Sequence, residues 1–241
     1  MFASQIASDV SDIRTGLLLK KLILPTPKFK LHRQYSSSRL AVEAYIAQHF
    51  EREYGAQIFS FLPMLITIQC KAEYSSAMGI RSATQSTLFL EKYLDKPIEE
   101  MIQHITKKAF HRHEIVEIGN LVATQRGASQ LMFILIAAAL IKTNVKWMVF
   151  TATPQVSKIL ARLKFKTIAL CEADQKKLQP RVSATNQWGK YYKSRPMVLA
   201  GDLSQTQRLI SNHRVINQVV NHYEDVVATI SNYLKHNTSD D

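Results

Sequence analysis

The sequence predicts one α/β domain, and three observations support this fold class. From residue 114 onward, short β-rich runs alternate with helical patterns. Two earlier β-rich runs, at residues 62–70 and 74–82, are separated by a short polar stretch and predict an antiparallel hairpin. The chain has 241 residues, of which 46% are hydrophobic, and this is enough to bury one substantial core.

The first half of the chain predicts a helix, the hairpin and a second helix. Residues 1–38 mix serine, threonine, two prolines and scattered lysines, so we interpret them as an N-terminal arm. Apolar residues then recur at helical spacing over residues 41–53, and Gly55 can end that helix. After the hairpin, residues 97–108 begin with a proline and two acids, which are typical of a first helical turn. Asp95 is placed to cap this helix.

The second half predicts three strands joined by two helices, followed by a last strand. The strand patterns cover residues 114–123, 146–152, 167–171 and 197–200, and the helical patterns cover residues 129–142 and 154–163. We expect crossover connections between the first three strands, with little antiparallel pairing in this half.

The C-terminal segment predicts one long amphipathic helix over residues 204–235. Its apolar stripe repeats every seven residues, at Leu209, Ile216, Tyr223 and Ile230. Such a stripe must be buried, either against the chain's own domain or against a second subunit. A homodimer is therefore one of two open interpretations.

The net charge of +12 predicts an acidic partner. Nucleic acid, an anionic lipid surface, a phosphorylated cofactor and an acidic carrier protein would all satisfy it. The sequence has neither zinc-knuckle spacing nor a glycine-bracketed aromatic strand, so we do not expect nucleic acid.

The sequence also predicts the compartment. Its two cysteines have apolar neighbours and no close cysteine partner, which fits a reducing environment. The start of the chain lacks the features of a signal peptide. The strongest apolar run, residues 131–141, would form a helix only ~16 Å long against a hydrocarbon layer of ~30 Å. We expect a soluble, cytoplasmic protein without a transmembrane segment.

Several blocks of the sequence resemble the thermostable hemolysin family. They are residues 88–99 (LFLEKYLDKPIE), 115–121 (IVEIGNL), 150–153 (FTAT) and 188–192 (WGKYY), followed by the pair 201–202 (GD). The order of elements is also similar to the GNAT fold of acyltransferases and of its relatives, the acyl-homoserine-lactone synthases. The resemblance implies an α/β, GNAT-like mixed sheet flanked by helices over residues 39–203. An arm (1–38) precedes it, and a C-terminal amphipathic helix and tail (204–241) follow.

The resemblance implies where an acyl donor would bind. In the GNAT fold the fourth strand splays from the fifth, and the pantetheine arm of a thioester lies in the gap like an added strand. The implied donor-binding residues are Ile118, Asn120, Leu121, Gln125, Arg126, Gly127, Ala128, Thr151 and Thr153. The turn at residues 124–127 precedes a helix whose N-terminus can hold a phosphate. We expect no tightly bound cofactor, but an acyl-phosphopantetheine thioester as co-substrate, on acyl carrier protein or on coenzyme A.

The same turn departs from the usual GNAT loop, Gln/Arg-x-x-Gly-x-Gly/Ala, because one glycine is displaced and the other is missing. The similar lactone synthases also depart from that loop and draw mainly on acyl carrier protein, which is acidic. Lys158, Arg162, Lys164 and Lys166 could form a basic face that docks such a carrier. The alternative is an ordinary solvated helix face.

Acyl transfer to an amine needs a group that accepts the amine proton, and a carboxylate on an apolar strand can do this. Glu117 is the candidate, because its strand is similar to the Glu-Leu-Ser-Arg strand of the lactone synthases, with Asn120 in place of the arginine. The alternative is a strand-edge glutamate that points to water. At the position where GNAT enzymes usually carry a tyrosine as general acid, this sequence has Leu160. Tyr191 or Tyr192 could instead protonate the leaving thiolate, or could simply pack.

His111 and His113 would project to one side of an extended chain, but the sequence shows no third ligand, so we predict no metal site. Cys171 has no histidine or positive helix end beside it and fits a buried structural thiol better than a thioester-forming nucleophile.

These features predict an acyltransferase that moves an acyl group, expected to be fatty, from acyl carrier protein or acyl-coenzyme A to a small-molecule amine. Glu91, Asp95 and Trp188 are expected to line the acceptor or acyl pocket. Two alternatives stay open. The family's name suggests a membrane-active hemolysin, and the missing tyrosine and loop glycine suggest a non-catalytic binding protein on a GNAT scaffold.

Overall fold

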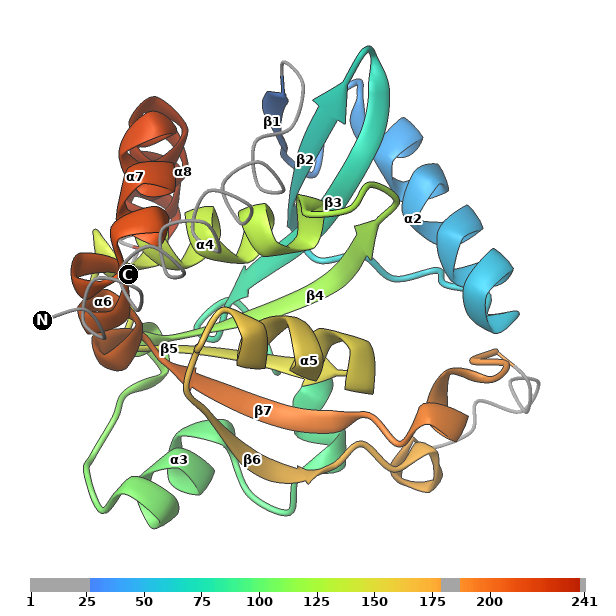
Figure 1. Cartoon of the computed structure of the whole chain (residues 1–241). Coiled ribbons are helices and arrows are strands. Elements are labelled where there is room, and N and C mark those ends of the chain that lie inside the picture. The colour runs from blue at the N-terminus through green and yellow to red at the C-terminus, as the bar shows by residue number, and fades with distance from the viewer. Residues whose placement is uncertain (1–26, 179–186, 239–241) are drawn as a thin grey trace, which may run out of the picture.

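The computed structural model describes residues 27–178 and 187–238, which fold around one twisted sheet (Figure 1). In this part of the chain the sheet has seven strands in the order β1-β2-β3-β4-β5-β7-β6. The strands are β1 (Lys28–His32), β2 (Met64–Cys70), β3 (Glu73–Ser82), β4 (Ile115–Ala123), β5 (Trp147–Ala152), β6 (Thr167–Glu172) and β7 (Met197–Asp202). All neighbours pair antiparallel except β4 and β5. The predicted hairpin is confirmed as β2 and β3.

The predicted crossovers are present, but antiparallel pairing is more extensive than we expected. Helix α4 (Ala128–Ile141) connects β4 to its parallel neighbour β5, and α5 (Pro154–Arg162) connects β5 to β6. Strand β6 does not pair with β5. Strand β7 lies between them and pairs antiparallel with both. The expectation of little antiparallel pairing is therefore wrong, because the order of elements along the chain does not say which position a later strand takes.

Helices cover both faces of the sheet. Helices α4 and α5 and the C-terminal helices share one apolar core with one face. Helix α2 (Arg39–Tyr54), the 3-10 helix η1 (Phe89–Tyr93) and α3 (Ile98–Thr106) cover the other face. Short 3-10 turns lie at η2 (Arg112–Glu114), η3 (Gln175–Lys177) and η4 (Tyr191–Ser194). Helix α4 is buried over almost its whole length, which confirms the buried helix predicted from its apolar sequence.

The C-terminal segment forms three helices instead of the single long helix that we predicted. They are α6 (Leu203–Asn212), α7 (Arg214–His222) and α8 (Glu224–Thr238). The break between α6 and α7 falls at His213, whose backbone is extended with φ −101° and ψ 101°. The break at His213 is not visible in the seven-residue repeat, because the apolar residues before and after it are buried in the same core around α4. The stripe therefore packs within its own chain.

The start of α3 also differs from the prediction. Pro97, not Asp95, occupies the N-cap position. The backbone N–H of Ile98 donates to Oε1 of Glu91 at 3.0 Å, so a carboxylate from a neighbouring element satisfies this helix end. Asp95 instead pairs with Nζ of Lys177 at 2.7 Å.

Part of the segment interpreted as an N-terminal arm belongs to the sheet. Residues 28–32 form edge strand β1, and the ring of Phe29 packs against that of Tyr223, between α7 and α8, with ring centroids 5.3 Å apart. Residues 1–26 of the arm lie outside the described residues.

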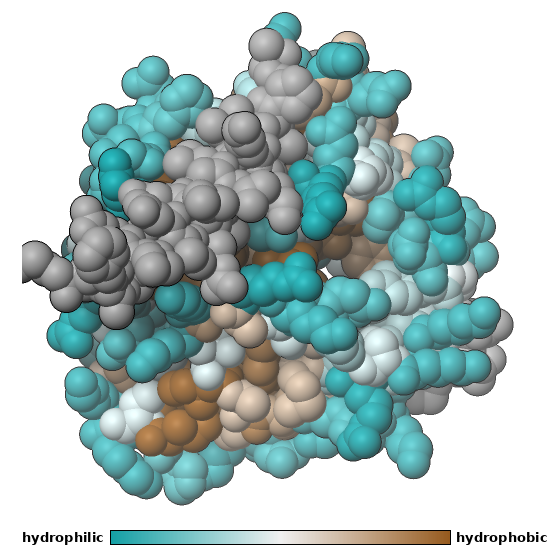
Figure 2. Space-filling view, in the orientation of Figure 1, coloured by the Kyte–Doolittle hydropathy of each residue, from teal (hydrophilic) through white to brown (hydrophobic). Residues whose placement is uncertain are grey.

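Among the described residues, no helix combines the length and the apolar character needed to cross a membrane. Figure 2 shows mostly hydrophilic residues over the face in view, with hydrophobic residues gathered low in the picture, beside α3 and β6. Ile168, Leu170 and Phe110 are half-buried hydrophobic residues of this part of the fold.

Candidate active site

Strands β4 and β5 pair over only part of their length. Residues 115–118 of β4 lie opposite residues 147–150 of β5, although β4 continues to Ala123 and β5 to Ala152. Figure 1 shows the two strands diverging beyond the paired part. This leaves a stretch of β4 edge that β5 does not use, which is the gap expected for a GNAT-like fold.

A bulge in β4 accounts for the divergence. Gly119 pairs with Gly79 and Val122 pairs with Ala77, so β4 carries one residue more than β3 between these two pairs. Asn120 lies in this interval with a left-handed backbone, φ 49°. A bulge bends its strand, and asparagine tolerates this conformation better than most residues.

The Asn120 side chain is committed to the segment between α2 and β2. Its Oδ1 accepts a hydrogen bond from the Leu62 N–H at 2.8 Å, and its Nδ2 donates to the Ser60 carbonyl at 3.3 Å. Leu62 packs closely on the facing pair Gly79 and Gly119. A Cβ added at Gly79 would lie only 2.8 Å from the Cβ of Leu62. The Asn120 side chain is therefore occupied by Leu62 and Ser60, and only the Asn120 backbone could contact the acyl donor.

The turn after β4 leads into the N-terminus of α4. Gly127 has a left-handed backbone, φ 92°, and α4 begins at the next residue. Gln125 and Arg126 are exposed on this turn, and Oγ1 of Thr124 anchors it by donating to the Tyr74 carbonyl at 3.1 Å. Because the turn follows the free end of β4, the N-terminus of α4 lies at the open end of the gap. Within the first turn of α4, the Ala128 N–H donates to the Gln125 carbonyl at 3.2 Å.

The other predicted donor residues lie around the same gap. Ile118 is buried against the α4 side, and Leu121 packs on that core. Thr153 caps α5 by accepting from the Val156 N–H at 3.4 Å. Thr151 is half-buried on β5, and Ala128 is buried at the start of α4.

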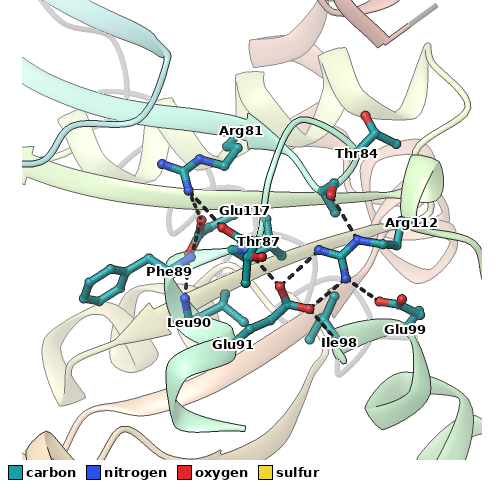
Figure 3. Close-up of polar contacts among 12 residues, drawn as sticks. Arg81, Thr84, Thr87, Phe89, Leu90, Glu91, Ile98, Glu99, Arg112 and Glu117 are labelled. Atoms are coloured by element: carbon teal, nitrogen blue, oxygen red, sulfur yellow. Dashed lines mark hydrogen bonds and ion pairs between the residues drawn. The ribbon is translucent and has the colours of Figure 1, made fainter. Parts of the chain in front are cut away.

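Glu117 lies on the sheet face opposite α4, and Figure 3 shows its carboxylate directed at the start of η1. It accepts hydrogen bonds from the backbone N–H groups of Phe89 at 3.1 Å and Leu90 at 3.0 Å. Nη1 of Arg81, across the pair with β3, lies 3.9 Å from the same carboxylate. Glu117 is only 4% exposed, so the alternative of an edge glutamate pointing to water is wrong.

Burial raises the pKa of Glu117, although the two backbone donors and Arg81 act against it. A carboxylate with a raised pKa is a stronger proton acceptor while it stays ionised. Each of its oxygens accepts one protein hydrogen bond and keeps capacity for another. Glu117 therefore caps η1 and still has the chemistry of a base.

A second carboxylate, Glu91, forms an ion-pair network beside Glu117 (Figure 3). Arg112 binds it with two donors, Nη1 at 2.8 Å and Nη2 at 3.0 Å, and Nη1 also contacts Glu99 at 2.7 Å. Burial alone would raise the pKa of Glu91, but Arg112 and the N–H groups of Ile98 and Leu88 outweigh it and lower the pKa. Glu91 is thus a well-satisfied structural carboxylate.

The predicted acceptor residues are not brought together. Glu91 and Asp95 line a cavity of about 560 Å³ with Arg112 and the loop 83–87. Trp188 does not line it but packs on Phe89 at 5.7 Å between ring centroids. The three residues, which come from the sequence blocks 88–99 and 188–192, are therefore split between two places.

Trp188 belongs to an aromatic cluster that joins α2, η1 and the residues before β7. Its rings are Phe50, Tyr54, Phe89, Tyr93, Trp188, Tyr191 and Tyr192. Gly189 holds the last segment on α2, because any Cβ there would lie 2.1 Å from the Tyr54 carbonyl. The Thr153 side chain, at the end of β5, acts against the burial that raises the pKa of Tyr54, so the cluster reaches the end of β5.

The two predicted tyrosine acids differ in their surroundings. Burial raises the pKa of Tyr191, whose ring lies inside the cluster. Burial also raises the pKa of Tyr192, to about 12, against a hydrogen bond between its hydroxyl and that of Tyr93. Both tyrosines therefore stay protonated at neutral pH, although the raised pKa makes each hydroxyl a weaker acid.

The remaining candidates lie on the surface or within the packing. Lys158, Arg162, Lys164 and Lys166 are all exposed on α5 and the turn after it. The rings of His111 and His113 stack at 5.4 Å, and the described residues hold no group of three metal-ligating side chains. Cys171 is half-buried and unbridged, and its thiol contacts the Tyr93 carbonyl at 3.5 Å.

Four residues of this site do not stand out in the sequence: Arg81, Leu62, Tyr54 and Tyr93. Tyr93 lies within one of the blocks that carry the family resemblance, so a signal for it was present. The positions of the other three depend on strand register and on loop packing, which the sequence pattern does not contain.

Comparison with solved structures supports the fold. The acyl-homoserine-lactone synthase LasI is similar with a TM-score of 0.50 and 15% sequence identity, over 75% of this chain and 91% of LasI. FeeM, an N-acyl amino acid synthase from uncultured soil microbes, has a TM-score of 0.48 and 12% identity, over 73% of this chain and 89% of its own. At such identities the similarity to LasI shows the fold alone, and it confirms the predicted GNAT-like class.

Comparison of the sequence itself gives the family. No curated protein matches the chain. The family model of the thermostable hemolysins matches residues 32–207, which is most of the chain and includes β4, β5 and the aromatic cluster. The protein therefore belongs to the thermostable hemolysin family.

Proposed function

We propose that this protein is an acyltransferase that moves an acyl group from a phosphopantetheine thioester to an amine. One observation carries the proposal: β4 leaves β5 after Ile118, one residue beyond the buried carboxylate of Glu117. A gap for an extended thioester arm and a candidate base thus lie side by side on one strand.

Backbone chemistry supports this position for the donor. The free edge of β4 beyond Ile118 offers N–H and C=O groups that can pair with the amides of a pantetheine arm, as an added strand would. The N-terminus of α4 and the exposed Arg126 lie at the open end of the gap, where they suit phosphate groups. The fold shared with LasI, a synthase of acyl-homoserine lactones, supports the same class of reaction.

The reaction needs two proton transfers. The amine nitrogen attacks the thioester carbonyl, and its proton passes to Glu117, whose raised pKa suits a base. The carbon–sulfur bond then breaks, and Tyr192 supplies a proton to the thiolate from a hydroxyl that is protonated at neutral pH. The products are an amide and a free thiol, and the proton held by Glu117 returns through solvent to the Tyr192 phenolate, which restores both groups.

We propose acyl carrier protein as the preferred donor, because four exposed cations, Lys158, Arg162, Lys164 and Lys166, lie on α5 and the turn after it and offer a basic docking face. Coenzyme A is the other possible carrier. Both cysteines are free thiols, which supports the cytoplasm as the compartment. A fatty amide is amphiphilic, so such a product would account for a lytic phenotype without a pore.

The test compares cells that express the wild type with cells that express Glu117→Gln. Mass spectra of lipid extracts should show acyl amides in the wild type only, and purified wild type should release thiol from acyl carrier protein thioesters when the matching amine is added. Identical lipid profiles in both strains, together with no thiol release, would exclude the transferase and favour the binding protein. Prompt leakage of dye from liposomes by purified protein would instead favour a membrane-active hemolysin.

A further inference from the structure

The side chain of Leu62 lies at the point where β4 leaves β5. Gly119 is the first residue of β4 beyond the paired part, and a Cβ added there would lie 3.0 Å from Cδ1 of Leu62. A Cβ on the facing Gly79 would lie 2.8 Å from Cβ of Leu62. The two glycines thus leave a recess in the sheet surface, and Leu62 fills it.

Leu62 is held in this recess from both sides. Its N–H donates to Oδ1 of Asn120 at 2.8 Å, and its carbonyl accepts from Nη2 of Arg39 at 2.8 Å. Arg39 is itself buried, and Nε of its guanidinium pairs with Glu43 at 2.6 Å. A side chain on a backbone that is fixed at both its N–H and its carbonyl has little freedom to move away.

We propose that Leu62 determines how long an acyl chain the donor site accepts. This inference rests on the proposed function, because it requires the donor to lie between β4 and β5. A thioester arm that enters at the N-terminus of α4 and follows the free edge of β4 reaches Gly119 where the gap closes. On the α4 side of this point, Ile118 and Phe150 are buried in the core. The proposal places the acyl chain on the other side, the face of Glu117, where the buried side chain of Leu62 fills the recess over Gly79 and Gly119.

The volume of the Leu62 side chain then sets the longest acyl chain that fits. A rigid apolar pocket discriminates between chains by roughly 10- to 200-fold per methylene group. Leu62→Ala removes three side-chain carbons, so the preferred acyl chain should lengthen by about two or three carbons. Leu62→Phe should shorten it.

The experiment measures binding as well as turnover. Non-hydrolysable thioether analogues of acyl-pantetheine, in a graded series from butyryl to palmitoyl, are titrated into wild type, Leu62→Ala and Leu62→Phe by calorimetry. Thiol release from the matching thioesters is followed in parallel. Leu140→Ala is the matched control, because Leu140 is fully buried near the C-terminal end of α4, away from the gap, and loses the same three carbons.

The expected result is opposite shifts of the tightest-binding chain in the two Leu62 variants, with about tenfold or greater gains for longer chains in Leu62→Ala and a wild-type profile in the control. Equal profiles in all proteins would overturn the role of Leu62, even if thiol release shows that transfer occurs. A chain-length shift without thiol release would support Leu62 and overturn the transferase reaction alone. Failure of the wild type to bind any analogue would overturn both.

A thermal melt of each protein precedes the titrations. If Leu62→Ala is unfolded at the assay temperature, Leu62→Met replaces it, because this change conserves volume while the unbranched side chain adapts its shape. A broader range of accepted chains in Leu62→Met supports the role of Leu62, and an unchanged range overturns it.

Discussion

Glu117 and Leu90 are joined by a hydrogen bond from the Leu90 backbone N–H to Oε1 of the Glu117 carboxylate, at 3.0 Å. The neighbouring N–H of Phe89 donates to the other oxygen of the same carboxylate. Glu117 therefore stabilises the start of η1 and is also the candidate base. These two roles predict different responses to substitution.

Glu117→Gln should lower the rate of amine acylation by about 10²- to 10⁴-fold, because the amide keeps one oxygen for the η1 backbone but has almost no proton affinity. In the wild type, the rate should rise with pH as the carboxylate ionises, and the midpoint should lie above the ordinary value because the pKa of Glu117 is raised. Thiol release measured across pH tests both statements. A folded Glu117→Gln protein with unchanged turnover would remove Glu117 from the mechanism.

The raised pKa of Glu117 also predicts a pH-dependent stability. The folded protein binds this proton more tightly than the unfolded chain does, so the contribution is complete below the unfolded pKa of about 4.3 and is lost as pH rises through the folded pKa. Urea unfolding should show that stability in this window falls less with pH in Glu117→Gln than in the wild type. Parallel curves for the two proteins would contradict the raised pKa.

Glu91→Gln should act in the opposite pH direction. The pKa of Glu91 is lowered, so its contribution is present above the unfolded pKa and is lost as pH falls through the folded pKa. Near neutral pH the variant should lose about 1.5–3 kcal/mol, the usual value of a hydrogen bond to a charged group, and the loss should shrink in acid. Glu172→Gln is the control, because Glu172 pairs with the exposed Arg195. The melting temperature of this variant should barely change, since exposed ion pairs contribute little to stability. Equal losses in both variants would argue against the Glu91 network.

Reversal of Lys158 and Arg162 to glutamate should weaken binding of acyl carrier protein while leaving binding of free acyl-pantetheine unchanged, since only the carrier needs the basic face. The affinity of the wild type for the carrier should also fall as salt is added. Reversal of the exposed Lys28 and Lys30 on the edge strand β1 makes the same change of net charge and should leave carrier binding near the wild-type value. Equal loss with both ligands would place the carrier elsewhere.

Asn120→Ala should destabilise the protein more than Asn120→Gly does. Both variants lose the hydrogen bonds to Leu62 and Ser60, at about 0.5–1.5 kcal/mol each. Alanine must also adopt φ 49°, which adds about 1 kcal/mol, whereas glycine adopts it freely. Urea unfolding of the two variants measures the difference. A more stable alanine variant would show that the bulge relaxes when the side chain is removed.

Local sequence pattern accounts for the elements that neighbouring residues control. The hairpin, the buried helix α4 and the strand, turn and helix around residues 115–141 follow from apolar periodicity and from turn residues, and the structure confirms them. Ordered blocks of sequence indicate the family, and the match of the family model confirms it. Glu117 stands out in the sequence because a carboxylate inside an apolar strand is unusual.

How distant elements meet depends instead on the tertiary fold. The sheet position of β7 and the three-helix C-terminus depend on which elements compete for the same buried surface, and periodicity does not encode that competition. The split between Glu91 and Trp188 has the same origin, because their separation depends on where η1 and the segment before β7 pack. Leu62 acquires its position from two glycines and an asparagine on strands β3 and β4, contacts that exist only once the chain has folded.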